Sequence, residues 1–191
     1  MARTLSTMME LGTSAPSFKL PDLNGEIISD DQFINKPMLV MFICNHCPYV
    51  KHVIHKLAAL AKDYQSRGVA VVAINSNDTK QYPDDAPQKM KALAAEYDFS
   101  FPYLFDESQS VAKAYRAACT PDFYLFNAEH KLVYRGQMDE SRPGTNVPIT
   151  GRDLTAAVHS LVEGKPIFEN QLPSMGCNIK WKPGNEPDYF G

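Results

Sequence analysis

Residues 38–50 read MLVMFICNHCPYV, and this stretch decides the fold. The apolar run at 38–43 is unbroken, which is typical of a strand buried on both faces of a sheet. Cys44 and Cys47 follow directly. Over 47–67 apolar residues recur every three or four positions, which predicts a helix with one apolar face. The two cysteines therefore lie where a buried strand turns into a helix.

This position of the cysteines favours thiol–disulfide chemistry. Backbone N–H groups in the first turn of a helix have no partner within the helix, and they stabilise a thiolate, the nucleophilic form of cysteine. Cys44 precedes the helix, so we expect it to be exposed and to attack a substrate disulfide. Cys47 lies at the border of the apolar face, so we expect it to be shielded and to resolve the mixed disulfide. His46 lies between them and, as a cation or N–H donor, favours the Cys44 thiolate.

The rest of the chain alternates between predicted strands and helices. A second apolar run at 69–74 follows the helix, and the strand–helix–strand order predicts parallel pairing with a right-handed crossover. The remaining predicted elements are a hairpin over 15–29, helices over 87–97, 110–118 and 153–163, and strands over 103–105, 123–126 and 131–135. We predict one domain over 1–163. We expect the tail 164–191 to pack on this domain because the tail holds several large apolar side chains.

Composition limits the classes of function. The chain has 191 residues and a formal net charge of -3, which argues against a nucleic-acid partner because phosphate binding needs a basic face. The N-terminal segment lacks the apolar core of a signal peptide, and the longest apolar runs are too short to span a bilayer. We therefore expect a cytoplasmic protein with no membrane partner. Thiols are kept reduced in the cytoplasm, so the 4 cysteines are more often catalytic or metal-binding than structural there.

Three segments together resemble the thioredoxin superfamily: residues 38–50, the opening APSFKLPD at 15–22, and Thr120-Pro121 before the strand at 123–126. The opening is similar to the AhpC/TSA and TlpA/ResA-type branches. The resemblance implies an α/β, thioredoxin-like fold with a central four- or five-stranded mixed sheet flanked by helices, an N-terminal β-hairpin and an extended C-terminal tail. It also implies a cis-proline loop that faces the cysteines and holds substrate chains by backbone contacts. The stretch MGCNIKW in the tail extends the resemblance to a peroxiredoxin-like group.

Departures from the family patterns narrow the expected activity. Peroxiredoxins use the pattern Pro-x-x-x-Thr/Ser-x-x-Cys, and the positions that align with its Pro and Thr/Ser hold Val40 and Cys44 here. We therefore expect at most weak peroxidase activity by the standard mechanism. ResA-like proteins have an acid three positions after the second cysteine, where this chain has Val50. The sequence thus offers no evident proton acceptor for Cys47.

Our main hypothesis is a thiol–disulfide oxidoreductase that needs no organic cofactor and no metal. Its partners would be protein or small-molecule disulfides and a thiol electron donor, and its oligomeric state is open. One alternative is a peroxiredoxin-like thiol peroxidase or peroxide sensor. Another is a non-enzymatic module in which Cys44, Cys47 and a histidine bind a soft metal such as Cu(I). A structural zinc site is disfavoured because the chain has no second CxxC motif.

The other two cysteines are candidates for accessory redox roles. Cys119 adjoins the predicted cis-proline loop, so it has either a mixed-disulfide role or the packing role of a small apolar residue. Cys177 lies in the tail, where it is either a buried thiol or a reversible disulfide partner. We interpret the neighbouring Asp84 and Asp85 as the start signal of a helix and not as a metal site.

Overall fold

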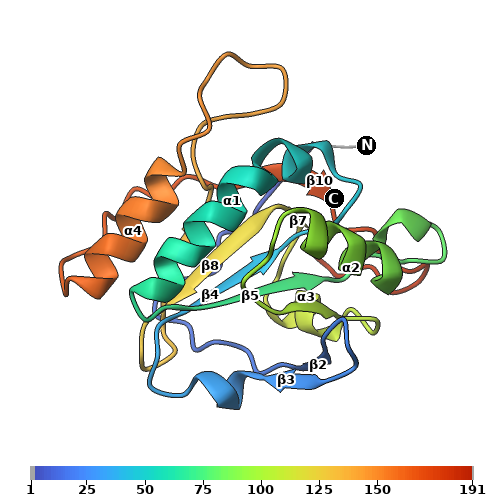
Figure 1. Cartoon of the computed structure of the whole chain (residues 1–191), viewed down its shortest axis with the longest axis horizontal. Helices are drawn as coiled ribbons and strands as arrows, with labels where there is room; N and C mark the ends of the chain where they lie inside the picture. The colour runs from blue at the N-terminus through green and yellow to red at the C-terminus, as the bar shows by residue number, and fades with distance from the viewer. Residues whose placement is uncertain (1–2, 191) are drawn as a thin grey trace.

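A five-stranded sheet forms the centre of the molecule (Figure 1). The computed structural model describes residues 3–190. The strands lie in the order β6 (Tyr103–Phe105), β5 (Ala70–Asn75), β4 (Met38–Phe42), β8 (Asp122–Phe126) and β9 (Leu132–Gly136). β4 pairs parallel with β5 and antiparallel with β8, so the sheet is mixed. The predicted thioredoxin-like α/β architecture is confirmed.

Helices and a hairpin cover the two faces of this sheet (Figure 1). The helices are α1 (Pro48–Ser66), α2 (Pro87–Glu96), α3 (Ser110–Ala114) and α4 (Arg152–Val162), with short 3₁₀ turns η1 (Asp30–Phe33) and η2 (Pro83–Asp85). The hairpin consists of β2 (Lys19–Pro21) and β3 (Ile27–Ser29). α1, α2 and α4 pack on one face, whereas α3 and the hairpin pack on the other. The two layers leave neither face of the central strands open to water.

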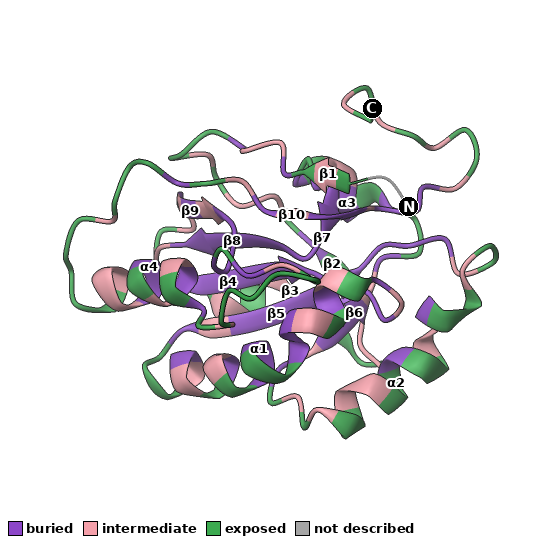
Figure 2. Cartoon of the chain, turned by 90° about the horizontal axis from the view of Figure 1, so that it is seen from above, coloured by how far each residue is buried: buried purple, intermediate pink, exposed green. Residues whose placement is uncertain are grey.

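β4 shows why its sequence is apolar at every position. Leu39 and Met41 belong to the apolar cluster under α1, whereas Met38 and Val40 belong to the cluster against the hairpin. Successive side chains of a strand alternate between the two faces, so both faces of β4 demand apolar residues. Figure 2 shows the same burial along β4, β5 and β8.

A second, three-stranded antiparallel sheet joins the two ends of the chain. Its order is β1 (Arg3–Leu5), β10 (Met175–Asn178) and β7 (Cys119–Thr120), and the sequence patterns predicted none of these strands. β10 belongs to the tail, and its Cys177 lies opposite Thr120 in the register with β7. The tail therefore runs directly beside the cis-proline loop.

Two further features complete the architecture. The helix expected over 110–118 ends at Ala114, and Arg116 adopts a left-handed conformation with φ 50, which is incompatible with a continuing α-helix.

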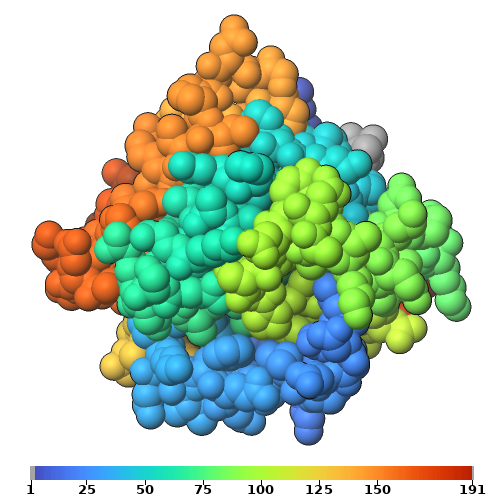
Figure 3. All heavy atoms as spheres, in the orientation of Figure 1, coloured from blue at the N-terminus to red at the C-terminus, as the bar shows by residue number. Residues whose placement is uncertain are grey.

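The largely exposed loop at 142–150 stands out from the surface beside α1 and α4 (Figure 3). Among the residues that the structure describes, no helix is long and apolar enough to cross a bilayer.

Candidate active site

Cys44 and Cys47, called the cysteine pair below, lie at the predicted junction of strand and helix. β4 ends at Phe42 and α1 begins at Pro48, so Cys47 is the N-cap residue of the helix. Proline suits the first helical position because an N–H group there would have no partner in the helix. The N–H of Val50, in the first turn, favours a thiolate at Cys47.

Thr120 contacts both sulfurs of the cysteine pair. The Thr120–Pro121 peptide bond is cis, as expected from the resemblance. Thr120 Oγ1 lies 3.3 Å from Cys44 Sγ, and the Thr120 carbonyl oxygen accepts a hydrogen bond from Cys47 Sγ at 3.2 Å. The structure thus brings together the cysteines and the loop that the sequence singled out separately.

Cys44 is buried, so the expectation that it is exposed is wrong. Its exposed fraction is 1%, and that of Cys47 is 0%. Two segments distant in sequence close the site: β10 pairs with the strand of Thr120, and the turn that carries Asp85 bonds to the backbone next to Cys44. A local sequence pattern contains no sign of either contact. Exposure therefore does not distinguish the attacking thiol from the resolving thiol.

The two thiols have opposite electrostatic surroundings. Burial raises the pKa of Cys44 well above its usual value, and the hydrogen bond with Cys47 and the nearby Asp85 carboxylate raise it further. The pKa of Cys47 is lowered to about 2, first by a hydrogen bond from the Cys177 thiol and next by one from the Cys44 thiol, which together outweigh burial. These surroundings favour ionisation of Cys47 over ionisation of Cys44.

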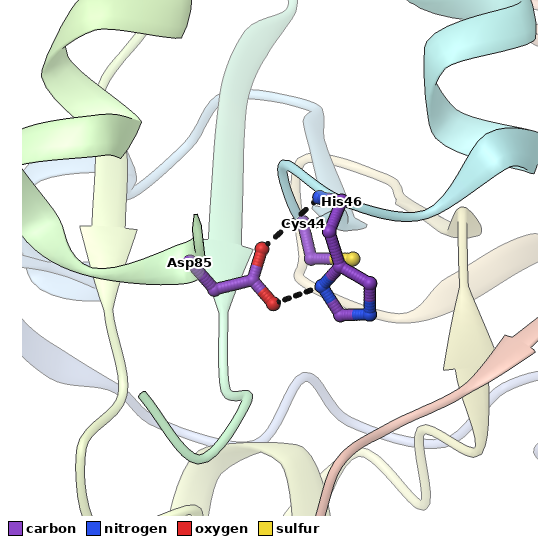
Figure 4. A group of neighbouring side chains, drawn as sticks. All are labelled: Cys44, His46 and Asp85. Atoms are coloured by element: carbon purple, nitrogen blue, oxygen red, sulfur yellow. Dashed lines mark hydrogen bonds and ion pairs between the residues drawn. The ribbon is translucent and has the colours of Figure 1, made fainter. Parts of the chain in front are cut away.

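His46 is held by Asp85, a residue that the sequence marked only as a helix start. His46 Nδ1 lies 2.5 Å from Asp85 Oδ2 (Figure 4). Asp85 Oδ1 accepts the N–H groups of Asn45 at 2.7 Å and of His46 at 3.2 Å. Burial alone would raise the pKa of Asp85, but hydrogen bonds from His46 and Asn77 outweigh burial and lower that pKa. A buried carboxylate anion thus fixes the orientation of the imidazole ring.

The imidazole ring lies beside the Cys44 sulfur. Ligand atoms of Cys44, His46 and Asp85 all lie within 4.8 Å of one another (Figure 4). His46 Nε2 is buried and has no hydrogen-bond partner among the residues that the structure describes. The ring is therefore held by Asp85 through Nδ1 and lies near the Cys44 sulfur, and the structure describes no hydrogen-bond partner for its Nε2.

The same three side chains are the group best placed to hold a metal ion in the described part of the chain. Cysteine and histidine are ligands that soft metals such as Cu(I) prefer. However, the two Asp85 oxygens already accept hydrogen bonds from Asn45, His46 and Asn77. A metal bound through Asp85 would have to replace some of these bonds, so the arrangement fits a proton acceptor better than a metal site.

The structure treats the two accessory cysteines differently. Cys177 lies opposite Thr120 and belongs to the same buried cluster as the cysteine pair. Cys119 precedes Thr120 on β7, so its side chain points to the other side of the strand. There its sulfur faces two backbone carbonyl oxygens at 3.8 and 4.0 Å. Cys177 is thus brought to the cysteine pair, whereas Cys119 is directed away from it.

Comparison with known proteins identifies the family. The family model described as AhpC/TSA family matches residues 11–135. The chain belongs to the AhpC/TSA family. The matched segment contains the cysteine pair and Thr120-Pro121. It ends before the tail, so Cys177 lies outside it.

Individual relatives refine this assignment to the AhpC/TSA family. The thiol-disulfide oxidoreductase ResA of Bacillus subtilis (strain 168) is 30% identical over 132 residues, which are 68% of this chain and 70% of that protein. The crystal structure of a conserved protein from Geobacillus kaustophilus is 52% identical, with a TM-score of 0.94 over 96% of this chain and 98% of that one. A secreted disulfide oxidoreductase of Mycobacterium tuberculosis shares the fold at 17% identity, with a TM-score of 0.59 over 75% of this chain and 96% of that one. The chain is an oxidoreductase of the thioredoxin-like, ResA-related branch.

Proposed function

We propose that the chain is a thiol–disulfide oxidoreductase whose redox centre is the cysteine pair. The observation that carries this proposal is the contact of both sulfurs with Thr120, at 3.3 and 3.2 Å, next to the cis Pro121. One residue of the cis-proline loop thereby holds both sulfurs at the N-terminus of α1. The similarity to the thiol-disulfide oxidoreductase ResA of Bacillus subtilis supports the same activity.

The lowered pKa of Cys47 supports an order of attack opposite to the one that the sequence predicts. The thiolate is the attacking species in disulfide exchange, and its surroundings favour it at Cys47. In the proposed reaction the Cys47 thiolate attacks a substrate disulfide, so that a mixed disulfide forms and one substrate thiolate leaves. The Cys44 sulfur then attacks Cys47. The Cys44–Cys47 bond forms, the mixed disulfide breaks, and the second substrate thiolate leaves.

His46 has a role in the second step of this reaction. Cys44 is protonated at rest, because burial raises its pKa, and it must lose this proton in order to attack. The imidazole of His46 lies beside Cys44, and the Asp85 carboxylate would stabilise the protonated ring. We assign His46 as the proton acceptor and Asp85 as the positioning residue that holds it. This assignment replaces the expected role of His46 in stabilising a Cys44 thiolate.

The burial of both sulfurs means that the proposed reaction needs a local opening of the structure. β10 and the turn around Asp85 cover the cysteine pair, and such segments open at a lower free-energy cost than the whole fold. In the open form, the backbone of Thr120 and Pro121 would bind an extended substrate chain. The proposed substrates are protein or small-molecule disulfides, and a thiol donor reduces the pair again. A cytoplasmic location stays a prediction.

Reduction of insulin and of a small disulfide by the purified enzyme, with a thiol donor in excess, tests the proposal. Cys47→Ser should lose turnover, and Cys44→Ser should lose at least about tenfold because the sulfur that normally releases the substrate from Cys47 is missing. Cys119→Ser is the matched control and should keep wild-type turnover, because its sulfur faces away from the pair. Unchanged turnover in Cys47→Ser or Cys44→Ser would overturn the proposal.

The lowered pKa of Cys47 also favours a second candidate function, the reduction of a peroxide. Cys47 occupies the position of the peroxide-reactive cysteine in the peroxiredoxin pattern, although Cys44 replaces the hydroxyl residue of that pattern. Stopped-flow oxidation of Cys47 by hydrogen peroxide separates the two functions. A rate near that of free cysteine rejects the peroxidase.

A further inference from the structure

The tail strand β10 places a third sulfur against the cysteine pair. Residues directly opposite each other in antiparallel strands point to the same face, with Cβ atoms about 4.5–5.5 Å apart. Cys177 lies opposite Thr120, and the Thr120 side chain contacts Cys44 at 3.3 Å. The Cys177 side chain therefore lies on the face that looks toward the pair. Its thiol hydrogen-bonds to the Cys47 sulfur.

Gly176 makes this close approach feasible. A Cβ atom at position 176 would lie 1.9 Å from the Thr120 carbonyl oxygen and 2.6 Å from its carbonyl carbon. These distances are far below van der Waals contact, so a residue with a side chain would push β10 away from Thr120. α1 also packs against β10, which pairs with β1 along one edge and with β7, the strand of Thr120, along the other. The position of Cys177 is thus fixed from two sides.

We propose that Cys177 is a second disulfide partner of Cys47, and that a Cys44–Cys47 disulfide exchanges with a Cys47–Cys177 disulfide inside the site. This inference rests on the proposed function, because the substrate disulfide supplies the first oxidation. Cys47 is the sulfur shared by both disulfides because it accepts hydrogen bonds from both thiols. Neither the family match nor the CxxC motif includes Cys177.

The exchange needs no further oxidant. The Cys177 thiol gives up its proton, and its sulfur attacks Cys47 Sγ. The Cys47–Cys177 bond forms, the Cys44–Cys47 bond breaks, and Cys44 leaves as a thiolate that takes up the proton. One disulfide and one thiol are present before and after the step. The oxidised bond thereby moves from the CxxC loop to the tail strand β10.

Disulfide mapping of a Cys44→Ser variant tests this proposal. The reduced full-length variant is oxidised with a small aromatic disulfide, quenched in acid, alkylated, digested and analysed by mass spectrometry. We expect a peptide that links Cys47 to Cys177 in most of the protein. Adding Cys119→Ser to this variant should leave the linkage unchanged. Adding Cys177→Ser should leave Cys47 in a mixed disulfide with the reagent.

The wild-type protein, oxidised in parallel, separates this inference from the proposed function. A wild-type Cys44–Cys47 linkage together with reagent retained on Cys47 in Cys44→Ser would overturn the role of Cys177 and leave the proposed function standing. No Cys44–Cys47 linkage in the wild type would overturn the proposed function instead. If circular dichroism shows that Cys44→Ser is unfolded, the digest of the oxidised wild-type protein tests the role of Cys177 instead. We expect that digest to contain some peptide that links Cys47 to Cys177, and a digest without this peptide overturns the proposal.

Discussion

The segment from β4 to α1 and the tail strand β10 bring cysteines to the same site by different routes. The first segment does so locally, because a buried strand, a short loop and a helix N-terminus fix Cys44 and Cys47 relative to each other. The tail strand does so through long-range pairing, which sets Cys177 opposite Thr120. A local sequence motif can therefore identify part of a redox site, here Cys44 and Cys47, while another residue of the site, here Cys177, has no local pattern that reveals it.

The largest effect on stability should come from disrupting the pairing of β10 with β7 at Gly176. In Gly176→Ala the new Cβ would meet the Thr120 carbonyl oxygen at 1.9 Å, so β10 has to move away from β7. We expect a loss of about 4 kcal/mol or more in the free energy of unfolding, as for severe overpacking. The Cys47–Cys177 linkage should be lost with it. Urea unfolding and disulfide mapping measure the two effects.

A matched control for this variant is Gly184→Asn, also in the tail. Gly184 has φ +79, and a Cβ atom at this position would have no neighbour within 4 Å. Asparagine tolerates this left-handed conformation. We expect a change in unfolding free energy below about 0.5 kcal/mol. Equal losses in the two variants would show that the contact with Thr120 does not determine the position of β10.

A smaller effect on stability should come from Asp85→Asn, which changes the side chain that holds Asn45 and His46. The folded state lowers the pKa of Asp85, so its ionised form stabilises the fold above the unfolded-state pKa, near 4, and this stability is lost as pH falls through the folded-state pKa. We expect a loss of about 2 kcal/mol at pH 7 and a weaker dependence of stability on acid pH. Chemical unfolding between pH 3 and 7 measures both.

Asp84→Asn is the matched control for Asp85→Asn, because Asp84 is exposed and only its backbone carbonyl contacts Asn45. Its stability should match that of the wild type at every pH. In the activity assay, Asp85→Asn should slow the step in which Cys44 attacks the mixed disulfide, and Asp84→Asn should not. An Asp85→Asn variant with wild-type stability and an unchanged rate of this step would contradict the role of Asp85.

The smallest effect should come from Thr120→Val, which removes one hydroxyl and keeps the side-chain shape. The variant loses the 3.3 Å contact to Cys44 but keeps the backbone carbonyl that contacts Cys47. The Thr120 hydroxyl lowers the pKa of Cys44, so its loss should raise that pKa further. We expect a cost of about 1 kcal/mol and slower alkylation of Cys44, with alkylation of Cys47 unchanged. Mass spectrometry of the alkylated protein over time provides the measurement.

The sequence predicted the parts of the site that depend on local structure. The apolar run of β4 and the helical periodicity after Cys47 sufficed for the strand–helix junction and for the parallel pairing with the next strand. The resemblance to the thioredoxin superfamily supplied the mixed sheet and the cis-proline loop at Thr120-Pro121. Their positions in the fold then follow from the order of strands and helices.

The sequence could not predict the parts that depend on contacts between distant segments. Asp85 looks like a helix start until its turn folds back onto Asn45 and His46. β10 is a short run that contains Gly176, with no strand pattern of its own, and only its pairing partner defines it as a strand. The burial of Cys44 results from both segments, so the exposure that we expected from its position before the helix is wrong.

A redox titration of the cysteine pair tests the central claim most directly. The wild-type protein and the Cys177→Ser variant are equilibrated in glutathione buffers of increasing oxidising strength, quenched in acid, alkylated and mapped by mass spectrometry. We predict that a peptide linking Cys44 to Cys47 appears in a single two-electron transition in both proteins. Thiols that persist on both residues throughout the titration, or separate glutathione adducts on each, would contradict the account.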